Sequence, residues 1–140
     1  MSVSIGHTIY VKCSAQAVPL YQEVFGLALG YHVKNADGGF FHSELCSGEQ
    51  PVLCIAETSE AQPTNNIVCL GMTLENADAV RRAFTQLSDG GTVRMALTKL
   101  PWSPCCAEVI DRFGVWWYLT APQHRPDDGF DPDRFEYNRT

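Results

Sequence analysis

The sequence lacks long hydrophobic runs and basic runs. No apolar stretch approaches the roughly 20 residues that a membrane-spanning helix needs. The start, Met1-Ser2-Val3-Ser4, has neither the basic nor the apolar region of a signal peptide, so a cytoplasmic location is expected. Lys and Arg number 10 against 16 Asp and Glu, for a net charge of −6. This acidic balance argues against nucleic acid as a partner, because its phosphates would be repelled.

Several short motifs are also missing. The chain has no G-x-x-x-x-G-K-[ST], no G-x-G-x-x-G after a strand and no G-x-S-x-G, which are typical of nucleotide-binding proteins and serine hydrolases. The acidic segment 127–133 lacks the spacing of a calcium loop. No C-x-x-C occurs among the six cysteines, which argues against a zinc ribbon. Because the cytoplasm keeps thiols reduced, we expect free and mostly buried cysteines rather than three disulfides.

What the chain does contain is enough apolar material for one folded domain. It has 140 residues, of which 45% are hydrophobic and 19% are charged. A chain of this length and composition buries a sizeable core without disulfides or metals. We therefore expect a single globular domain, followed by a polar tail over 122–140.

A repeat at an offset of 63 residues organises the chain. Helical spacing predicts a helix over Ala15–Phe25, ended by Gly26, and a second one from the cap Asn76 to Ser88. The offset superposes their apolar faces, Ala17, Leu20, Tyr21 and Val24 on Val80, Ala83, Phe84 and Leu87.

Strands surround each of these helices. β-Branched and aromatic runs predict strands at Ile5–Lys12 and Ile67–Leu74 before the helices, and three strands after each helix. Self-similarity at a fixed offset indicates two copies of a strand–helix–three-strand module. The predicted boundaries are 5–58 for module one, 59–66 for a linker and 67–121 for module two. We expect the function to lie in a cavity that the copies enclose.

The second module carries a recognisable set of motifs. Gly90 to Leu97, then Pro101-Trp102, then Asp111-Arg112-Phe113-Gly114-Val115-Trp116-Trp117 resemble the PhnB-like branch of the vicinal-oxygen-chelate superfamily. In module one, Tyr21 to Gly26 and Phe41 to Leu45 resemble the helix-end and third-strand motifs of that branch. The superfamily includes glyoxalase I, bleomycin- and fosfomycin-resistance proteins and extradiol dioxygenases.

The resemblance covers roughly residues 5 to 121 and implies a fold and a kind of site. It implies an α+β fold, with two βαβββ modules forming a curved mixed β-sheet around a cavity, and often a homodimer. It also implies a divalent metal held by His, Gln or Glu from the first and last strands of each module. Aligned by motif, these ligand positions fall on Gly6, Ile55, Cys69 and Tyr118. Only Cys69 is a plausible ligand, so no metal site is predicted; if a metal is present, His7, Glu57 and Cys69 are the candidates.

Strand alternation predicts which residues face the cavity. In the first strand of module two, the apolar set beginning with Val68 should pack under the helix, which leaves Cys69, Gly71 and Thr73 inside. The last strand similarly leaves Trp116, Tyr118 and Thr120 inside. The offset of 63 then places inside, from module one, the residues Gly6, Thr8, Tyr10, Leu53, Ile55 and Glu57.

The predicted ligand pocket draws on these inward residues. Tyr10, Thr73, Trp116 and Tyr118 are expected to line it, with Trp102 beside them, because ligand pockets are mostly apolar with a few polar groups. The alternative is that Trp102, Trp116 and Tyr118 belong to a plain core or to a dimer interface.

Two polar residues of module one complete the candidate site. His42, in the third strand, could donate to an anionic ligand or act in acid–base chemistry, or be an ordinary hydrogen-bonded histidine of a sheet. Glu57 could be a buried general base, or a solvated carboxylate at the end of its strand.

Three functions follow from these observations. The first is a small-molecule-binding protein of the PhnB-like type without the usual metal site or any other cofactor. The second is a metal-dependent lyase, isomerase or dioxygenase of the same superfamily. The third is a dimeric protein that sequesters an antibiotic or toxin at the subunit seam. Partners other than a small molecule and a second copy of the chain are not expected, neither nucleic acid nor a membrane.

Overall fold

The structure is a computed structural model that describes residues 2–60 and 67–135. The chain divides into two compact units, Met1–Pro63 and Thr64–Thr140. Most of the predicted linker 59–66, and the end of the predicted tail, lie outside the described residues. None of the described helices is long and apolar enough to cross a membrane.

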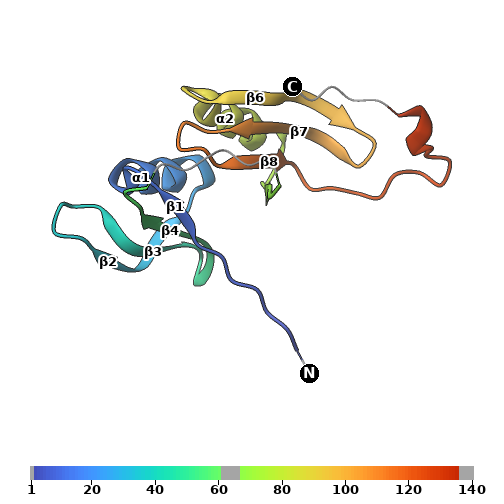
Figure 1. Ribbon diagram of the computed structural model, residues 1–140. Helices are drawn as coiled ribbons and strands as arrows, with labels where there is room; N and C mark the ends of the chain where they lie inside the picture. Colours follow the sequence, from blue (N-terminus) through green and yellow to red (C-terminus); the bar gives the residue numbers. More distant parts are fainter. Residues whose placement is uncertain (1, 61–66, 136–140) are drawn as a thin grey trace. The chain divides into compact units, whose positions relative to one another are not determined.

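The first unit pairs one helix with a mixed four-stranded sheet (Figure 1). Its strand order is β1-β4-β3-β2, with β1 parallel to β4 and the other neighbours antiparallel. The elements are β1 (Ile9–Val11), α1 (Ser14–Phe25), β2 (Ala28–Lys34), β3 (Phe40–Ser47) and β4 (Gln50–Glu57).

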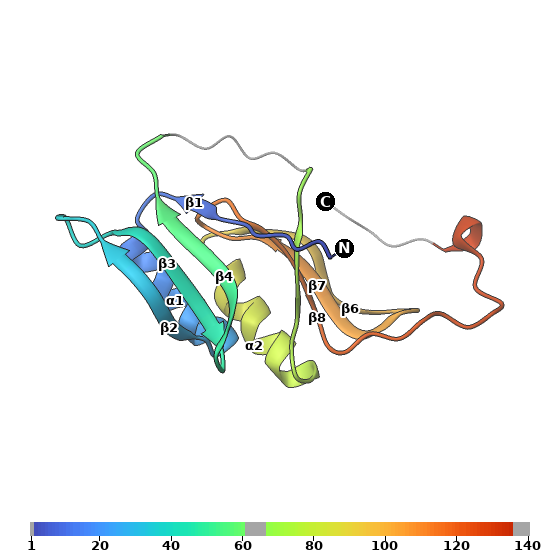
Figure 2. The ribbon, with the colours of Figure 1, turned by 90° about the horizontal axis from the view of Figure 1, so that it is seen from below.

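The second unit repeats this topology (Figure 2). Its strand order is β5-β8-β7-β6, with β5 parallel to β8. The elements are β5 (Leu70–Thr73), α2 (Ala77–Ser88), β6 (Thr92–Leu100), β7 (Ser103–Ile110) and β8 (Trp116–Thr120), followed by the short helix η1 (Pro132–Arg134). The prediction of two βαβββ modules and an α+β fold is therefore confirmed. Their union into one curved sheet around a cavity stays a prediction.

Each helix covers one face of its own sheet. In α2, the buried residues Val80, Ala83 and Leu87 follow helical spacing, and Trp117 and Leu119 of β8 are 0% exposed on the same side. Trp117 also donates from Nε1 to Oδ2 of the buried Asp111 at 2.8 Å. We call the sheet face turned away from the helix the open face.

The two helices begin in different ways. In α2, the Asn76 side chain accepts a hydrogen bond from Ala79 N at 2.9 Å, as the sequence predicted. In α1, Cys13 precedes the helix with φ 61° and its side chain makes no capping hydrogen bond. The carboxylate of Glu57, at the end of β4, accepts from Cys13 N at 3.1 Å and from Ser14 N at 2.9 Å instead. A residue 43 positions along the chain from Ser14 therefore caps this helix.

The first strand of each unit is shorter than predicted. Ladder pairing begins at Ile9 and at Leu70 rather than at Ile5 and Ile67. Ile5, Ile67 and Val68 are 96%, 85% and 65% exposed. The expectation that Val68 packs under the helix is therefore wrong. β-Branched residues favour extended backbone, but a strand also needs a neighbour to bond with.

The sequence offset between equivalent positions of the two units increases from 63 to 64 residues after the helices. The bounds of α1 and α2 differ by 63 residues at both ends, as predicted. The connection to the next strand is Gly26-Leu27 in the first unit and Asp89-Gly90-Gly91 in the second. From there onward equivalent positions lie 64 apart: Leu29↔Leu45 in the first sheet corresponds to Val93↔Val109 in the second.

This extra residue reverses the predicted faces of β4. Leu53 and Ile55 are 2% and 0% exposed and correspond to the helix-facing Trp117 and Leu119. The cavity-facing orientation predicted for Leu53, Ile55 and Glu57 is therefore wrong, because a slip of one residue moves a strand's side chains to the opposite face. The position of module one that corresponds to Tyr118 is Cys54, not Ile55, since the pair Glu44↔Cys54 matches Glu108↔Tyr118.

Candidate ligand-binding pocket

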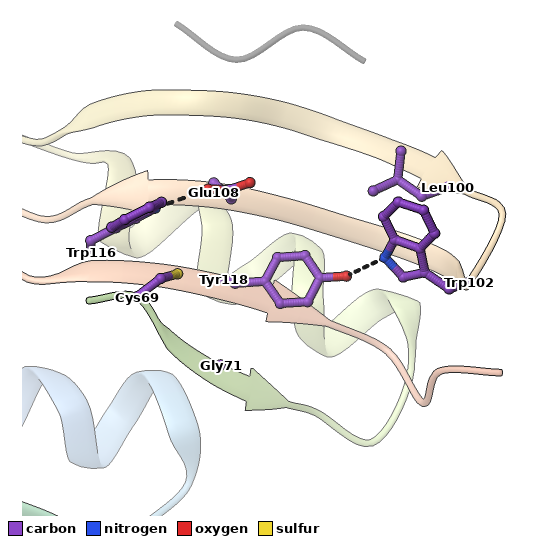
Figure 3. Close-up of a pocket in the computed structure, with 7 residues that line it drawn as sticks. All are labelled: Cys69, Gly71, Leu100, Trp102, Glu108, Trp116 and Tyr118. Carbon is purple, nitrogen blue, oxygen red and sulfur yellow. Dashed lines mark hydrogen bonds between the residues drawn. The ribbon is translucent and has the colours of Figure 1, made fainter. Parts of the chain in front are cut away.

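A pocket of about 320 Å³ lies on the open face of the second unit's sheet (Figure 3). It lies wholly within this unit, and strands β5, β6, β7 and β8 and the β6–β7 turn all contribute to it. Its lining residues are Cys69, Gly71, Leu100, Trp102, Glu108, Trp116 and Tyr118. Alternation along β5 and β8 brings Cys69 and Gly71 to the same face as Trp116 and Tyr118, as the sequence predicted.

Trp102 and Tyr118 form one aromatic side of the pocket. Trp102, in the β6–β7 turn, donates from Nε1 to the Tyr118 hydroxyl at 3.2 Å, and that hydroxyl donates to Gln123 Oε1 at 2.9 Å. Burial raises the pKa of Tyr118 above its ordinary value, partly offset by its hydrogen bonds with Thr120 and Trp102. The phenol therefore stays protonated at neutral pH and serves as a hydrogen-bond donor.

Glu108 and Trp116 form the opposite, polar side. Glu108, in the middle of β7, is 1% exposed and accepts from Trp116 Nε1 at 2.9 Å. The Arg94 guanidinium lies over the Trp116 ring, 4.6 Å from its centroid. Trp116 is thereby held in position by a carboxylate at its edge and a cation over its face.

Sequence reasoning missed Glu108. One signal was available, because a single carboxylate interrupts the otherwise apolar run Cys105 to Ile110. A charged residue in such a strand is rarely buried unless it has a partner. Strand pairing with Tyr118 then places it on the open face.

Gly71 leaves space in the pocket because it has no side chain. A Cβ added at this position would have Tyr118 Cδ2 as its nearest neighbour, at 4.0 Å. The space above Gly71 is therefore available to a ligand, and a longer side chain would occupy it. Thr73, predicted to line the pocket, is exposed two residues further along β5 and is not among the lining residues.

The remaining predicted site residues lie in the first unit. Tyr10 is 57% exposed on β1. His42 Nε2 lies 3.5 Å from Glu44 Oε2, and its ring is 6.0 Å from that of Tyr31. Burial, and to a smaller extent the Glu44 carboxylate, raise the pKa of Cys54, the cross-strand partner of Glu44.

The three metal candidates have separate surroundings. His7 Nε2 accepts from Cys54 N at 3.4 Å, Glu57 caps α1, and Cys69 lines the pocket of the second unit. Over residues 2–60 and 67–135, no group of three or more His, Cys, Asp or Glu side chains is placed to hold a metal ion. The pocket itself has two residues of these types, Cys69 and Glu108, whereas a site of the superfamily's kind needs three or four converging donors. The pocket's own residues therefore do not fit such a metal.

All six cysteines are free thiols, and Cys46, Cys105 and Cys106 are buried. Burial raises the pKa of Cys106, and its Sγ donates to Thr98 O at 3.6 Å. Cys106 is therefore a poor nucleophile, as expected for a thiol that fills a core.

Solved structures share this fold at low sequence identity. Protein PA1353 from Pseudomonas aeruginosa is 22% identical with a TM-score of 0.66, over 86% of this chain and 100% of its own. A PhnB protein from Bacillus cereus, titled a putative 3-demethylubiquinone-9 3-methyltransferase, is 19% identical with a TM-score of 0.71, over 85% and 99%. The fosfomycin resistance protein FosX from Listeria monocytogenes, complexed with Mn(II) and sulfate, is 14% identical with a TM-score of 0.63, over 87% and 92%.

The sequence comparisons agree with the fold. No curated protein matches the sequence at a significant level. A sequence profile of the Glyoxalase/Bleomycin resistance protein/Dioxygenase superfamily matches residues 4–119, which extend from before β1 almost to the end of β8. Since this match takes in both βαβββ modules, the chain belongs to the glyoxalase/bleomycin resistance protein/dioxygenase superfamily.

Proposed function

We propose that this protein binds a small, planar and largely apolar molecule in the pocket of its second unit, without a metal. One observation carries the proposal: Trp102, Trp116 and Tyr118 surround about 320 Å³ of space above Gly71. Ligand pockets typically enclose about 300–1,000 Å³ and are lined by aromatic and apolar side chains with few polar groups. A ligand of one or two fused rings suits this size.

The orientation of the aromatic side chains supports the proposal. Trp116 is anchored through its indole N–H and Trp102 through its own. Side chains held in this way lose little conformational entropy when a ligand binds, which favours affinity. Glu108 and the Tyr118 hydroxyl are the polar groups that would orient a ligand.

Tyr10 and His42 both lie on the open face of the first unit. They remain candidates for binding a ligand on that face. A homodimer in the cytoplasm is likewise part of the proposal, and it rests on the resemblance to the superfamily.

Fluorescence titration with N-phenyl-1-naphthylamine, a neutral aromatic probe, tests the proposal. We expect saturable binding with quenching of tryptophan emission, because two of the three tryptophans line the pocket. Gly71→Leu should reduce the affinity at least tenfold, since the new side chain fills the pocket. Thr73→Leu, on the same strand and the same face, is the matched control and should bind normally. Equal binding by both variants and the wild type would contradict the proposal.

A metal-dependent lyase, isomerase or dioxygenase is the second candidate. It is supported by the Mn(II) complex of FosX, a protein with the same fold, and by the presence of Cys69 and Glu108 in one pocket. Elemental analysis of protein purified without a histidine tag decides between the two. A stoichiometric divalent metal would favour the enzyme, whereas less than about a tenth of an equivalent would exclude it.

A dimeric resistance protein is the third candidate. Its support is the likeness of fold to FosX, a fosfomycin resistance protein. It requires a dimer at micromolar concentration, which size-exclusion chromatography with light scattering measures. A monomer would remove this candidate and leave the binding pocket of the second unit unaffected.

A further inference from the structure

The segment after β8 returns to the pocket-lining tryptophan. Figure 1 shows it leaving β8 and passing the tip of the β6–β7 hairpin before η1. His124 N donates to Trp102 O at 2.9 Å, and Gln123 Oε1 accepts from the Tyr118 hydroxyl at 2.9 Å. Both bonds link the segment to residues that line the pocket.

Two phenylalanines further along add apolar contacts. The Phe130 and Phe135 rings lie 6.2 Å and 5.4 Å from the Trp102 ring, each edge-to-face, and 5.6 Å from each other. Phe135 also packs with Trp102 against the buried cluster of Met95, Leu100 and Cys106. The other described residues of 123–135 are exposed apart from the half-buried Pro126.

Trp102 is half-buried in the β6–β7 turn, so contacts from outside the turn contribute to the position of its side chain. The Trp102 ring lines the pocket and also contacts the Phe130 and Phe135 rings. Through these ring contacts and the two hydrogen bonds, the segment helps to hold Trp102 and Tyr118 where they line the pocket.

We propose that residues 123–135 form a strap that positions Trp102 and Tyr118 and that must loosen for a ligand to exchange. The inference rests on the proposed function only for its effect on a ligand; the positioning of Trp102 stands by itself. Few buried contacts and a mostly exposed surface make such a segment open more easily than the sheet beside it. The ligand would in turn stabilise the docked strap, because both act on the same two side chains.

Amide hydrogen exchange by NMR tests the strap without any ligand. The His124 amide reports docking, because its hydrogen bond goes to Trp102 O. In the double variant Phe130→Ala/Phe135→Ala we expect this amide to exchange about tenfold faster. The reason is that the variant loses the edge-to-face contacts of the two phenylalanine rings with Trp102 and with each other. Amides paired between β7 and β8 should exchange as in the wild type. Arg134→Ala, exposed in the same segment, is the matched control, and Phe130→Tyr/Phe135→Tyr should restore slow exchange.

Stopped-flow dissociation of N-phenyl-1-naphthylamine tests the effect on exchange of a ligand. The double alanine variant should release the probe about tenfold faster, and saturating probe should slow His124 exchange in the wild type. Unchanged His124 exchange in the alanine variant, or unchanged probe release despite faster exchange, would overturn the strap. A wild-type protein that does not bind the probe, but whose His124 amide still responds to the alanine substitutions, would contradict the proposed ligand and support the positioning of Trp102 by the strap.

Discussion

The open faces of the two units carry a glutamate at the same position of the fold and surround it differently. Glu44 and Glu108 each pair across the sheet with the fourth strand of their module, Glu44 with Cys54 and Glu108 with Tyr118. The Glu44 side chain is 30% exposed beside His42, whereas Glu108 is 1% exposed and bonded to Trp116. The same backbone position thus yields a partly exposed glutamate beside a histidine in one unit and a buried pocket wall in the other.

The difference shows that the duplicated backbone provides the frame and that the neighbouring side chains decide the chemistry. Large aromatic residues on β8 cover Glu108 and enclose the pocket. The corresponding positions of β4 hold Val52 and Cys54, which are too small to do this. A duplication of the fold therefore does not imply a duplication of the site.

The largest expected effect on stability concerns the connection between the helix and the next strand, which is one residue longer in the second unit than in the first. A Cβ at Gly91 would lie 2.4 Å from Ile110 O, so Gly91→Ala should lower the free energy of unfolding by about 3 kcal/mol. Gly26→Ala meets no atom within 4 Å but has φ 64°, and should cost about 1 kcal/mol. Urea unfolding measures both values. An equal loss of unfolding free energy in the two variants would show that Gly91 is no more closely packed than Gly26.

A second comparison concerns the two helix caps. Glu57→Ala removes the acceptor of two backbone N–H groups and of the Ser14 hydroxyl, and should cost about 2 kcal/mol. Asn76→Ala removes the acceptor of one backbone N–H and should cost about 1 kcal/mol. Thermal unfolding followed by circular dichroism ranks the two variants. A larger loss for Asn76→Ala would refute the assignment of Glu57 as the cap of α1.

A third comparison concerns the equivalent glutamates. Glu108→Ala leaves the Trp116 N–H without its acceptor and should cost about 1.5 kcal/mol, with weaker probe binding. Glu44→Ala removes a partly exposed contact with His42, 3.5 Å away, and should cost about 0.5 kcal/mol or less. Chemical unfolding and probe titration of the two variants give the values. Similar effects from both would mean that the two open faces are more alike than their contacts indicate.

The smallest expected effect concerns the thiols. Cys13 is exposed in the first unit, whereas Cys106 of the second is buried with a raised pKa. Iodoacetamide at neutral pH should therefore label Cys13 first and leave Cys106 unmodified in the folded protein, because the thiolate is the reacting form. Peptide mass spectrometry after short labelling measures the order. Early labelling of Cys106 would indicate that β7 opens readily.

Much of the fold could be predicted from the sequence, since its signals are local. The spacing of Val80, Ala83 and Leu87 and the cap Asn76 defined α2, and alternation on β8 brought Trp116 and Tyr118 to one face. Glu57 was misjudged because its partners, Cys13 and Ser14, lie far away in the sequence. The faces of β4 were misassigned because one added residue between α2 and β6 altered the offset.

Local patterns of residues were enough to predict the two modules, their helices and the aromatic residues available for a pocket, because apolar periodicity and capping act over a few residues. The face of β4 that meets α1, the capping of that helix by Glu57 and the hydrogen bond of Glu108 with Trp116 emerged only from the folded chain. These outcomes depend on strand register and on contacts between residues distant in the sequence. A single added residue changes such contacts without disturbing any local pattern.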